Sequence, residues 1–378
     1  MTELYLGLDA HKTTILIGQA FRGRSQPELY GKASTDVESF VGVLRRILKK
    51  NGLAKEDVAL CYEAGPTGFV LARRLRALGY ECEVVAPSLI PTRASDRVKT
   101  DRRDAKKLAS LFRAGELTAV HVPDVEDEVI RDVGRSRTDA VEVQKRTKQQ
   151  LSGLLLRNGY HYKGKSTWCE SHMRYLRELV MPDRAQKVVL EEYLQRSDAA
   201  TAQVQRIEDQ MRLLLEGWTR RPFVEALQGF RGFQLVSSMV ITGELGDLLR
   251  FKHPRQLMAY LGLVPSEQSS GDKRRQGSIT KSGNSHARWM LVEVAHAYRL
   301  PPKISSALSK RQEGVSAAVR DVAWRAQNRL HRRFCRLTLR GMHRNKVIIA
   351  VARELTAFIW ELARIVDREQ QQARRQAG

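Results

Sequence analysis

The sequence predicts an α/β N-terminal part followed by a mainly helical remainder. Before residue 124, short apolar runs with strand character alternate with amphipathic helical patterns, and after it the patterns are helical. The strand-like runs lie at residues 3–9, 13–20, 28–33, 58–63 and 83–87. A chain of 378 residues, 42% of them hydrophobic, is long and apolar enough for two or three domains with real cores.

The order of the N-terminal elements predicts how they are arranged. The first two runs are separated by a short break, which predicts a hairpin, and the third continues the meander. A helix capped by Thr35 or Asp36 follows, then a buried strand ending in Glu63, a helix, a fifth strand and a last helix. Three consecutive strands followed by helix, strand, helix, strand and helix is the order of an RNase H-like fold.

Two carboxylates three residues apart, Asp101 and Asp104, lie at the start of that last helix and share one face of it. Asp101 could simply cap the helix, although a cap needs only one acid. Cations surround the pair: Lys99, Arg102, Arg103, Lys106 and Lys107. Carboxylates surrounded by lysines and arginines suit a metal ion that acts on a phosphate backbone.

Two further acids, Asp9 and Glu63, each close an apolar strand-like run. A single aspartate at a strand end is commonly a turn residue, which is the alternative for Asp9. In α/β sheets, however, sites gather at the carboxyl ends of strands. The four acids Asp9, Glu63, Asp101 and Asp104 therefore predict one divalent-metal site.

The charge of the chain points to a polyanionic partner. Lysine and arginine total 65 against 42 acids, which gives a formal net charge of +23 and a pI of about 10.2. No apolar run approaches the ~20 residues of a spanning helix, and the N-terminus lacks the basic start of a signal peptide, so we expect a cytoplasmic protein without a membrane partner. The four cysteines are scattered, which suggests neither a zinc motif nor a disulfide framework.

The middle of the chain is helical. Residues 124–157 and 199–216 predict long helices, separated by shorter ones at 173–179 and 185–194. This pattern is typical of an antiparallel coiled-coil arm, and a plain helical bundle explains it equally well.

Residues 266–285 predict a long polar loop with several hydroxyls and the cations Lys273, Arg274, Arg275 and Lys281. Such a loop could hold a phosphate while a serine attacks it. Composition by itself favours the simpler alternative, in which the serines only donate hydrogen bonds to a bound phosphate.

A strongly basic helical pattern occupies residues 303–340 and predicts a face that follows phosphates without reading sequence. The candidate nucleic-acid-binding residues of the helix and the loop are Lys273, Arg274, Arg275, Lys281, Arg325, Arg329, Arg332, Arg333 and Arg336.

Three groups of motifs carry a family resemblance over nearly the whole chain. They are Gly-Leu-Asp-Ala-His-Lys at 7–12 with Tyr-Glu-Ala-Gly-Pro-Thr-Gly at 62–68 and Lys-Thr-Asp-Arg-Arg-Asp-Ala at 99–105; Leu-Gly-Leu-Val-Pro-Ser-Glu-Gln-Ser-Ser-Gly at 261–271 with Gly-Ser-Ile-Thr-Lys-Ser-Gly-Asn at 277–284; and Gly-Met-His-Arg-Asn-Lys-Val-Ile-Ile-Ala-Val-Ala-Arg at 341–353. Together they resemble the insertion sequence 110 family of transposases, the RNA-guided DEDD recombinases with a RuvC-type domain and a C-terminal transposase domain.

The resemblance implies a domain organisation. It places a RuvC-like, RNase H-like metal-binding domain at 1–122, a helical or coiled-coil linker region at 123–220, a transposase domain with the serine loop at 221–366 and a flexible tail at 367–378. The helical insert between the two domains is longer than the family minimum.

The resemblance also implies a chemistry. Asp9, Glu63, Asp101 and Asp104 would bind Mg²⁺, and a serine would become covalently joined to DNA. Ser270, next to Gly271, matches the family pattern better than Ser269, and Ser278 is a distant third. The family uses donor and target DNA, a structured guide RNA encoded by the element (the bridge RNA) and a homo-tetramer assembled from dimers, acting in the bacterial cytoplasm and at the nucleoid.

Two other functions remain open from the residues. A metal-dependent endonuclease of the kind that resolves Holliday junctions would need only the four acids and water. A non-catalytic nucleic-acid-binding protein would need only the basic helices. Both leave the serine-rich segment without a purpose, so a DNA transposase acting through a phosphoserine intermediate is the preferred hypothesis.

Overall fold

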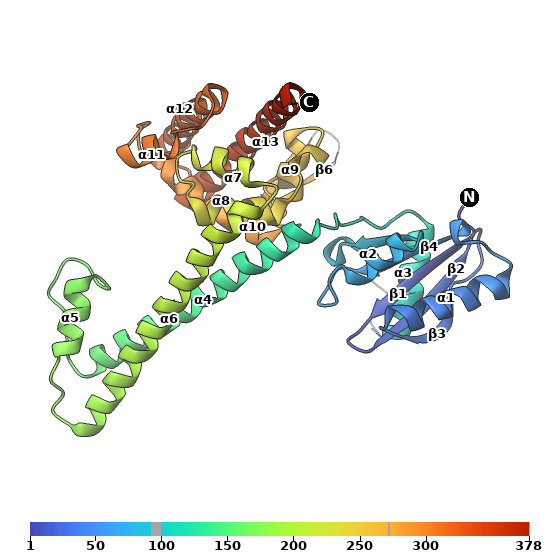
Figure 1. The fold of residues 1–378 in the computed structure, drawn as a ribbon, viewed down its shortest axis with the longest axis horizontal. Helices are drawn as coiled ribbons and strands as arrows, with labels where there is room; N and C mark the ends of the chain where they lie inside the picture. Colours follow the sequence, from blue (N-terminus) through green and yellow to red (C-terminus); the bar gives the residue numbers. More distant parts are fainter. Residues whose placement is uncertain (92–99, 271–272, 378) are drawn as a thin grey trace. The chain divides into compact units, whose positions relative to one another are not determined.

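The computed structural model describes residues 1–91, 100–270 and 273–377, without the side chains of 268–270, 273, 274 and 377. The chain divides into two compact units, Met1–Pro123 and Asp124–Gly378. Figure 1 shows a sheet with helices in the first unit and an almost entirely helical second unit.

The first unit is built on a mixed five-stranded sheet in the order β3-β2-β1-β4-β5. Strand β1 pairs antiparallel with β2 and parallel with β4; β3 is antiparallel to β2, and β5 is parallel to β4. The strands are β1 (Leu4–Ala10), β2 (Thr14–Phe21), β3 (Glu28–Ser34), β4 (Val58–Glu63) and β5 (Glu81–Val85), and the helices are α1 (Val37–Asn51), α2 (Val70–Ala77) and α3 (Asp101–Arg113), with short 3₁₀ turns η1 (Lys55–Asp57) and η2 (Pro87–Leu89). This arrangement is compatible with the predicted RNase H-like domain.

The two faces of the sheet are covered by different helices, because successive strand residues point to opposite faces. Leu4, Leu6 and Leu8 of β1 pack into one hydrophobic core with the buried sides of α1 and α2. The opposite face carries Gly7 and is covered by α3. Leu108 of α3 packs there with strand residues of β4 and β5.

The second unit contains the remaining described helices and one hairpin. The helices are α4 (Val125–Arg157), α5 (Glu170–Glu178), α6 (Arg184–Gly217), α7 (Arg221–Gln228), α8 (Leu235–Leu245), α9 (Pro254–Tyr260), α10 (Ser285–Ala295), α11 (Ser306–Arg311), α12 (Ala317–Leu339) and α13 (Arg344–Ala377), with 3₁₀ turns η3 (Leu248–Arg250) and η4 (His296–Arg299). The hairpin strands are β6 (Pro265–Ser270) and β7 (Lys273–Ile279). Helix α13 includes most of the segment that was predicted to be a flexible tail.

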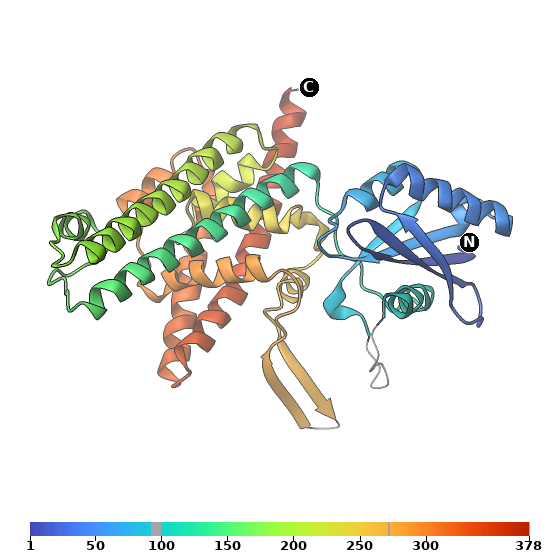
Figure 2. The same cartoon turned by 90° about the horizontal axis from the view of Figure 1, so that it is seen from below.

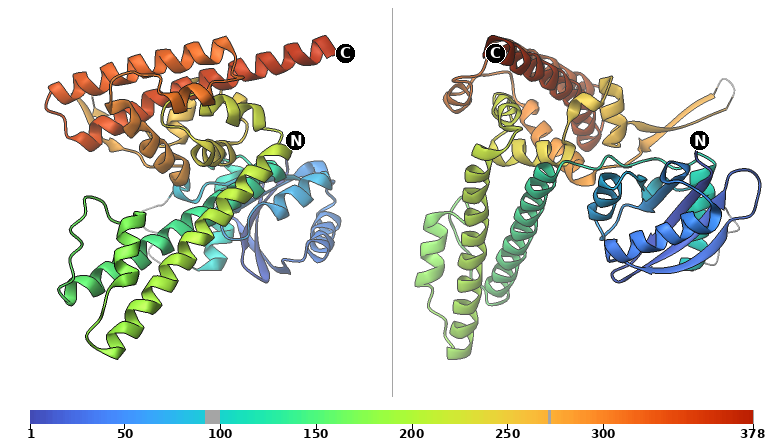
Figure 3. Two further views of the ribbon diagram at one scale, coloured as in Figure 1. Left: turned by 60° about the vertical axis from the view of Figure 1, so that its left-hand side comes forward. Right: turned by 45° about the vertical axis from the view of Figure 1, so that its right-hand side comes forward.

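Helices α4 and α6 lie side by side and antiparallel (Figure 3). Arg137 pairs with Glu208 at 2.7 Å, Gln144 donates to Thr201 at 3.0 Å, and Gln186 donates to Asn158 at 2.9 Å, so residue numbers fall along α6 as they rise along α4. These contacts show a helix pair, and supercoiling of the pair stays a prediction.

One expectation for this arm was wrong. The sequence predicted two helices at 185–194 and 199–216, whereas α6 is one continuous helix. Ser197 and Asp198 resemble a helix start signal in the sequence. In the structure the small Ser197 is buried within the helix, 1% exposed, and tertiary packing overrides the local signal.

The predicted polar loop at 266–285 is largely a hairpin. Strands β6 and β7 pair antiparallel and project from the helices of this unit (Figure 2). The sequence lacks a strand signal here because polar residues occupy both faces, so no apolar alternation is present. Among the residues that the structure describes, no helix has the length and apolar composition needed to cross a membrane.

Candidate functional site

The carboxyl ends of β1 and β4 place two of the predicted acids at one edge of the sheet. The two strands are parallel neighbours, with Leu8 in register with Tyr62, so Asp9 and Glu63 are the next residues along each strand. Asp9 is still within β1, opposite Leu16 of β2, and Glu63 is the last residue of β4. The topology therefore confirms that these two positions are neighbours at this edge.

Helix α3 brings the other two acids to the same place. Thr100 is the N-cap residue, and its Oγ1 accepts a hydrogen bond from the Arg103 amide at 3.4 Å. Asp101 and Asp104 belong to the first turn of the helix, so Asp101 is not the cap. The capping role that the sequence left open for Asp101 is filled by Thr100.

His11 joins two of these acids. Its Nε2 atom lies 3.2 Å from Oδ2 of Asp9 and 3.5 Å from Oδ2 of Asp101. The candidate ligand atoms of the three residues all lie within 4.8 Å of one another. The side chain of Asp9 is 22% exposed and that of Asp101 is 63% exposed, so the cluster is open to solvent on the side of the helix.

Burial and neighbouring charges shift the pKa of Asp9. Burial raises the pKa of Asp9, His11 lowers it, and the nearby charges of Asp101 and Asp104 raise it further. Asp104 is therefore close enough to act on Asp9, although it is not one of the three clustered ligand groups. A cation between these carboxylates would relieve their repulsion.

The donor set fits a divalent cation. Two carboxylates supply the oxygen ligands that Mg²⁺ and Mn²⁺ prefer, and Glu63 and Asp104 lie at the same edge. An imidazole nitrogen from His11 shifts the preference toward Mn²⁺ and later transition metals. His11 was not among the residues predicted from the sequence to bind the metal. The available signal was its position two residues after Asp9, because alternate residues of an extended segment point to the same side.

The predicted nucleophile lies on the hairpin. The backbone of Ser270 ends β6 opposite Lys273, and Ser269 pairs with Arg274. The side chains of these four residues are outside what the structure describes. Ser278 of β7 is exposed.

Among the described residues, three of the five predicted cations of α12 contact carboxylates and two do not. Arg325 pairs with Asp321 and with Glu361, each at 2.7 Å, and Arg329 pairs with Glu354 at 3.3 Å. Those contacts offset part of their charge. Arg332 and Arg336 are exposed, as are Arg275 and Lys281 on and after β7. Arg333 is half-buried, with Nε 3.7 Å from Oε1 of Glu354.

Comparison with known proteins places both units in one family. The transposase model for the DEDD type of IS110 elements matches residues 6–158, and the model described as Transposase IS116/IS110/IS902 family matches residues 224–309. The first match contains all four predicted acids and His11, and the second contains the hairpin.

Relatives agree with these matches. The protein y4qE of Sinorhizobium fredii, named as a transposase, is 43% identical over 362 residues, which cover 96% of this chain and 89% of that protein. The transposase for insertion sequence element IS1533 of Leptospira borgpetersenii is 29% identical over 339 residues, 88% of this chain and 96% of that protein. The transposase for insertion sequence element IS1111A of Coxiella burnetii is 23% identical over 237 residues, 60% of this chain and 61% of that protein. The predicted family is thereby confirmed: this chain is an insertion-sequence transposase and belongs to the IS110 family.

Proposed function

We propose that this transposase cuts and rejoins donor and target DNA through a phosphoserine intermediate, with Ser270 as the nucleophile and a divalent cation, Mg²⁺ in the cell, at the acidic cluster. The observation that carries the proposal is the convergence of Asp9, His11 and Asp101 within 4.8 Å, at the edge where Glu63 also ends its strand. Two carboxylates that repel each other, Asp9 and Asp101, are gathered there at a partly open surface, which supports a role in binding a cation.

The acids and the serine have different tasks. A divalent cation at the cluster would supply Lewis acidity toward the scissile phosphate. Asp9, Asp101, Asp104 and Glu63 would hold the cation, and His11 would complete and orient the ligand set. Arg275 and the neighbouring Lys273 and Arg274 steady the charge on the phosphate.

The proposed step balances without an energy source. The Oγ atom of Ser270 gives up its proton and attacks the phosphorus, and the phosphorus–oxygen bond to the adjoining nucleotide breaks. The departing strand takes up one proton and leaves as a free hydroxyl, so protons balance. Attack by the hydroxyl of an exchanged strand reverses these events and frees the serine. One phosphodiester is thus replaced by another of similar energy, and no nucleotide triphosphate is required.

Guidance and assembly follow the family resemblance. We propose that a structured RNA from the element pairs with donor and target DNA, so that the protein recognises shape and backbone and the RNA reads sequence. We also propose a tetramer assembled from dimers in which the acidic cluster and Ser270 of one site come from different protomers. A net charge of +23 supports a role in which the protein holds several nucleic-acid strands.

The test is cleavage of end-labelled donor DNA with the element's RNA and Mg²⁺, resolved on denaturing gels before and after protease. The expected product is a DNA fragment whose mobility depends on protease, absent with Ser270→Ala. Ser269→Ala and Ser278→Ala are the matched controls and should retain the adduct. Asp101→Asn should abolish cleavage altogether.

Two outcomes would overturn the proposal in different ways. Free cut ends from both wild type and Ser270→Ala would mean hydrolysis by water, as in a junction-resolving nuclease. An adduct that persists in Ser270→Ala and disappears in Ser269→Ala would move the nucleophile by one residue.

A further inference from the structure

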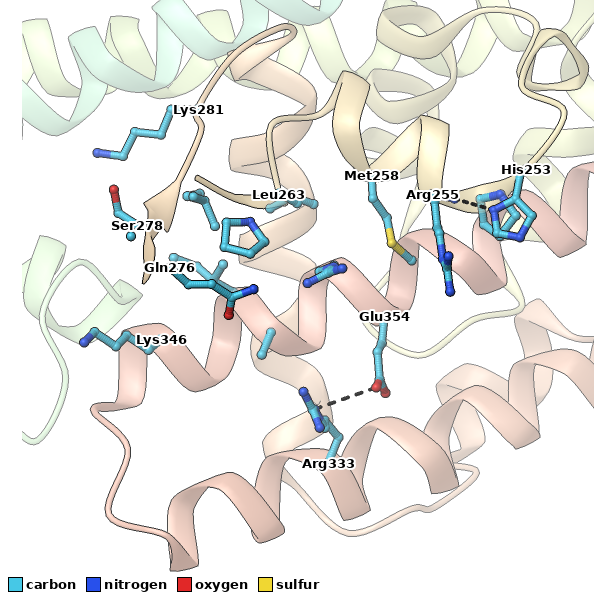
Figure 4. Close-up of a pocket in the computed structure, with 17 residues that line it drawn as sticks. His253, Arg255, Met258, Leu263, Gln276, Ser278, Lys281, Arg333, Lys346 and Glu354 are labelled. Atoms are coloured by element: carbon cyan, nitrogen blue, oxygen red, sulfur yellow. Dashed lines mark hydrogen bonds and ion pairs between the residues drawn. The ribbon is translucent and has the colours of Figure 1, made fainter. Parts of the chain in front are cut away.

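A pocket of about 830 Å³ lies in the second unit, among α9, the hairpin strand β7 and helices α12 and α13 (Figure 4). This volume is within the range of about 300–1,000 Å³ that is typical of small-molecule binding pockets in proteins. The pocket combines two kinds of wall. One is cationic and the other is apolar, and each restricts what the pocket can bind.

The cationic wall carries more positive than negative charge. Its members are Arg255, Lys281, Arg333, Lys346 and Arg353, against one carboxylate, Glu354. Within residues 1–91, 100–270 and 273–377, only Arg333 of these five pairs with a carboxylate. Glu354 already serves both Arg329 and Arg333, at 3.3 and 3.7 Å. The wall therefore favours a ligand with at least one negative charge.

Arg333 gives the clearest sign of an absent acceptor. Its Nε is shielded from solvent and has no hydrogen-bond acceptor among the described residues, since 3.7 Å to Glu354 is too long for a hydrogen bond. A buried guanidinium N–H without an acceptor is costly. In Figure 4 the Arg333 side chain points from its helix, α12, toward Glu354 of α13. A bound phosphate would supply the acceptor.

The apolar wall argues against a small inorganic anion as the ligand of this pocket. Met258 of α9, Leu263 and Ile349 of α13 line it, and Leu263 is 1% exposed. Inorganic phosphate gains nothing from such a surface, and the paired bases of an intact duplex cannot enter a pocket. A nucleobase outside the stack has flat apolar faces next to two phosphates, which matches both walls.

We propose that this pocket holds one unpaired nucleotide of the substrate DNA, its base against Met258 and Ile349 and its flanking phosphates on the cationic wall. This rests on the proposed function, because the hairpin links the pocket to the proposed nucleophile. Pro265 lines the pocket and Ser270 ends the same strand. The five residue steps from Pro265 to Ser270 span ~17 Å of extended chain. This length corresponds to about five base-pair steps of B-DNA.

The experiment measures binding by fluorescence anisotropy at one fixed salt concentration. Two labelled DNA duplexes are compared, identical except that one carries a single unpaired nucleotide. The full-length protein should bind the bulged duplex about tenfold more tightly. Ile349→Trp, which covers the apolar wall of the pocket with a larger side chain and leaves its charge unchanged, should bring the ratio close to one while affinity for the plain duplex stays within about twofold. Leu339→Trp, which adds the same side chain at an 88% exposed position of α12, should keep the wild-type ratio.

A second pair of variants tests the cationic wall and covers the case in which Ile349→Trp does not fold. Lys346→Gln, at an exposed pocket residue, should lower the ratio for bulged over plain duplex, whereas Lys310→Gln on α11 should not. A wild-type ratio of one, or a ratio unchanged in Lys346→Gln, would overturn the proposal. Tighter binding of the same bulge built in RNA would overturn its assignment to DNA.

The outcome separates this proposal from the one on which it rests. Bulge preference without a protease-sensitive adduct would refute the phosphoserine chemistry and leave the pocket in place. An adduct without bulge preference would refute the pocket alone. Ser270→Ala should lose the adduct and keep the bulge preference.

Discussion

Gly7 of β1 and Gly18 of β2 are paired across the strands, and a Cβ atom on either would lie 2.3 Å from the backbone of α3. For Gly7 the nearest atom is the amide nitrogen of Ala109, and for Gly18 it is the carbonyl oxygen of Ala105. Helix α3 therefore rests directly on the strand backbones. Its first turn carries Asp101 and Asp104 to the end of β1, so this glycine pair sets the spacing of the acidic cluster.

Substituting Gly18 with alanine should push α3 away from the sheet. We expect a loss of unfolding free energy of about 1–3 kcal/mol from overpacking and weaker Mn²⁺ binding, because Asp101 moves relative to Asp9. Calorimetry and an electron paramagnetic resonance titration of free Mn²⁺ measure the two effects. Gly42→Ala is the control: it lies in α1 with open space at its Cβ position, and we expect a gain of up to about 1 kcal/mol. Unchanged Mn²⁺ affinity in Gly18→Ala would show that α3 does not set the site.

Removing the imidazole of His11 should change which metal the cluster prefers. His11→Asn should weaken Mn²⁺ binding by about 100-fold or more, because loss of even an outer partner of a metal ligand costs about 10–100-fold. Mg²⁺ binding should fall less, since Mg²⁺ favours oxygen ligands. Competition titrations of Mn²⁺ with Mg²⁺ give the ratio. His161→Asn, at an exposed position between α4 and α5, should leave it unchanged. Equal losses for both metals would mean that His11 only positions the acids.

A buried network around Glu244 holds α4, α8 and α10 together. The carboxylate accepts hydrogen bonds from Arg135 Nε at 2.8 Å, Asn284 Nδ2 at 2.6 Å and His286 Nδ1 at 2.9 Å. Burial by itself would raise the pKa of Glu244, and the hydrogen bonds from His286, Arg135 and Asn284 outweigh it and lower the pKa to about 2.

Acid should therefore weaken the second unit. Because the folded pKa of Glu244 lies below its usual 4.5, its ionised form stabilises the fold above pH 4.5, and this contribution is lost as the pH falls toward 2. A shift of this size corresponds to about 3 kcal/mol. All five tryptophans lie in the second unit, so urea unfolding followed by tryptophan fluorescence reports on that unit. Glu244→Gln should be less stable at pH 7 and lose less stability between pH 5 and 2. Parallel curves for both proteins would contradict the prediction.

The ion pair of Asp127 with Arg220 should contribute far more than a surface pair. Asp127 is 1% exposed, its Oδ2 accepts from Arg220 Nε at 2.8 Å, and its Oδ1 accepts from the indole of Trp218 at 3.1 Å. Asp127→Ala leaves the indole N–H of Trp218 without its acceptor and Arg220 with only the exposed Asp124 as a partner among the described residues, and it should cost about 3 kcal/mol. Asp321→Ala breaks the exposed pair with Arg325 and should cost at most about 1 kcal/mol. Urea titrations with tryptophan fluorescence compare the two, and similar losses would show that burial adds nothing.

The sequence was informative where a local pattern has one physical meaning. Apolar runs of strand length, interrupted by turn residues, predicted every strand of the first sheet in chain order, because burial of the strands imposes that pattern. Acids at the ends of two such runs predicted that Asp9 and Glu63 would be neighbours, since parallel strands end at one edge. Motifs in both units predicted the family, which the comparisons confirmed.

Polar contacts between distant segments could not be predicted in this way. Glu244 and Arg135 are 109 residues apart, and the pocket joins α9, β7 and α13, which no periodicity connects. The same holds for the hairpin, whose polar strands lack an apolar face, and for the contact of His11 with Asp101, which lies on another element. The sequence by itself determined which segments form strands and helices and which acids can meet. The tertiary structure decided which polar groups pair, because that depends on how closely buried surfaces approach, as at Gly7 and Gly18.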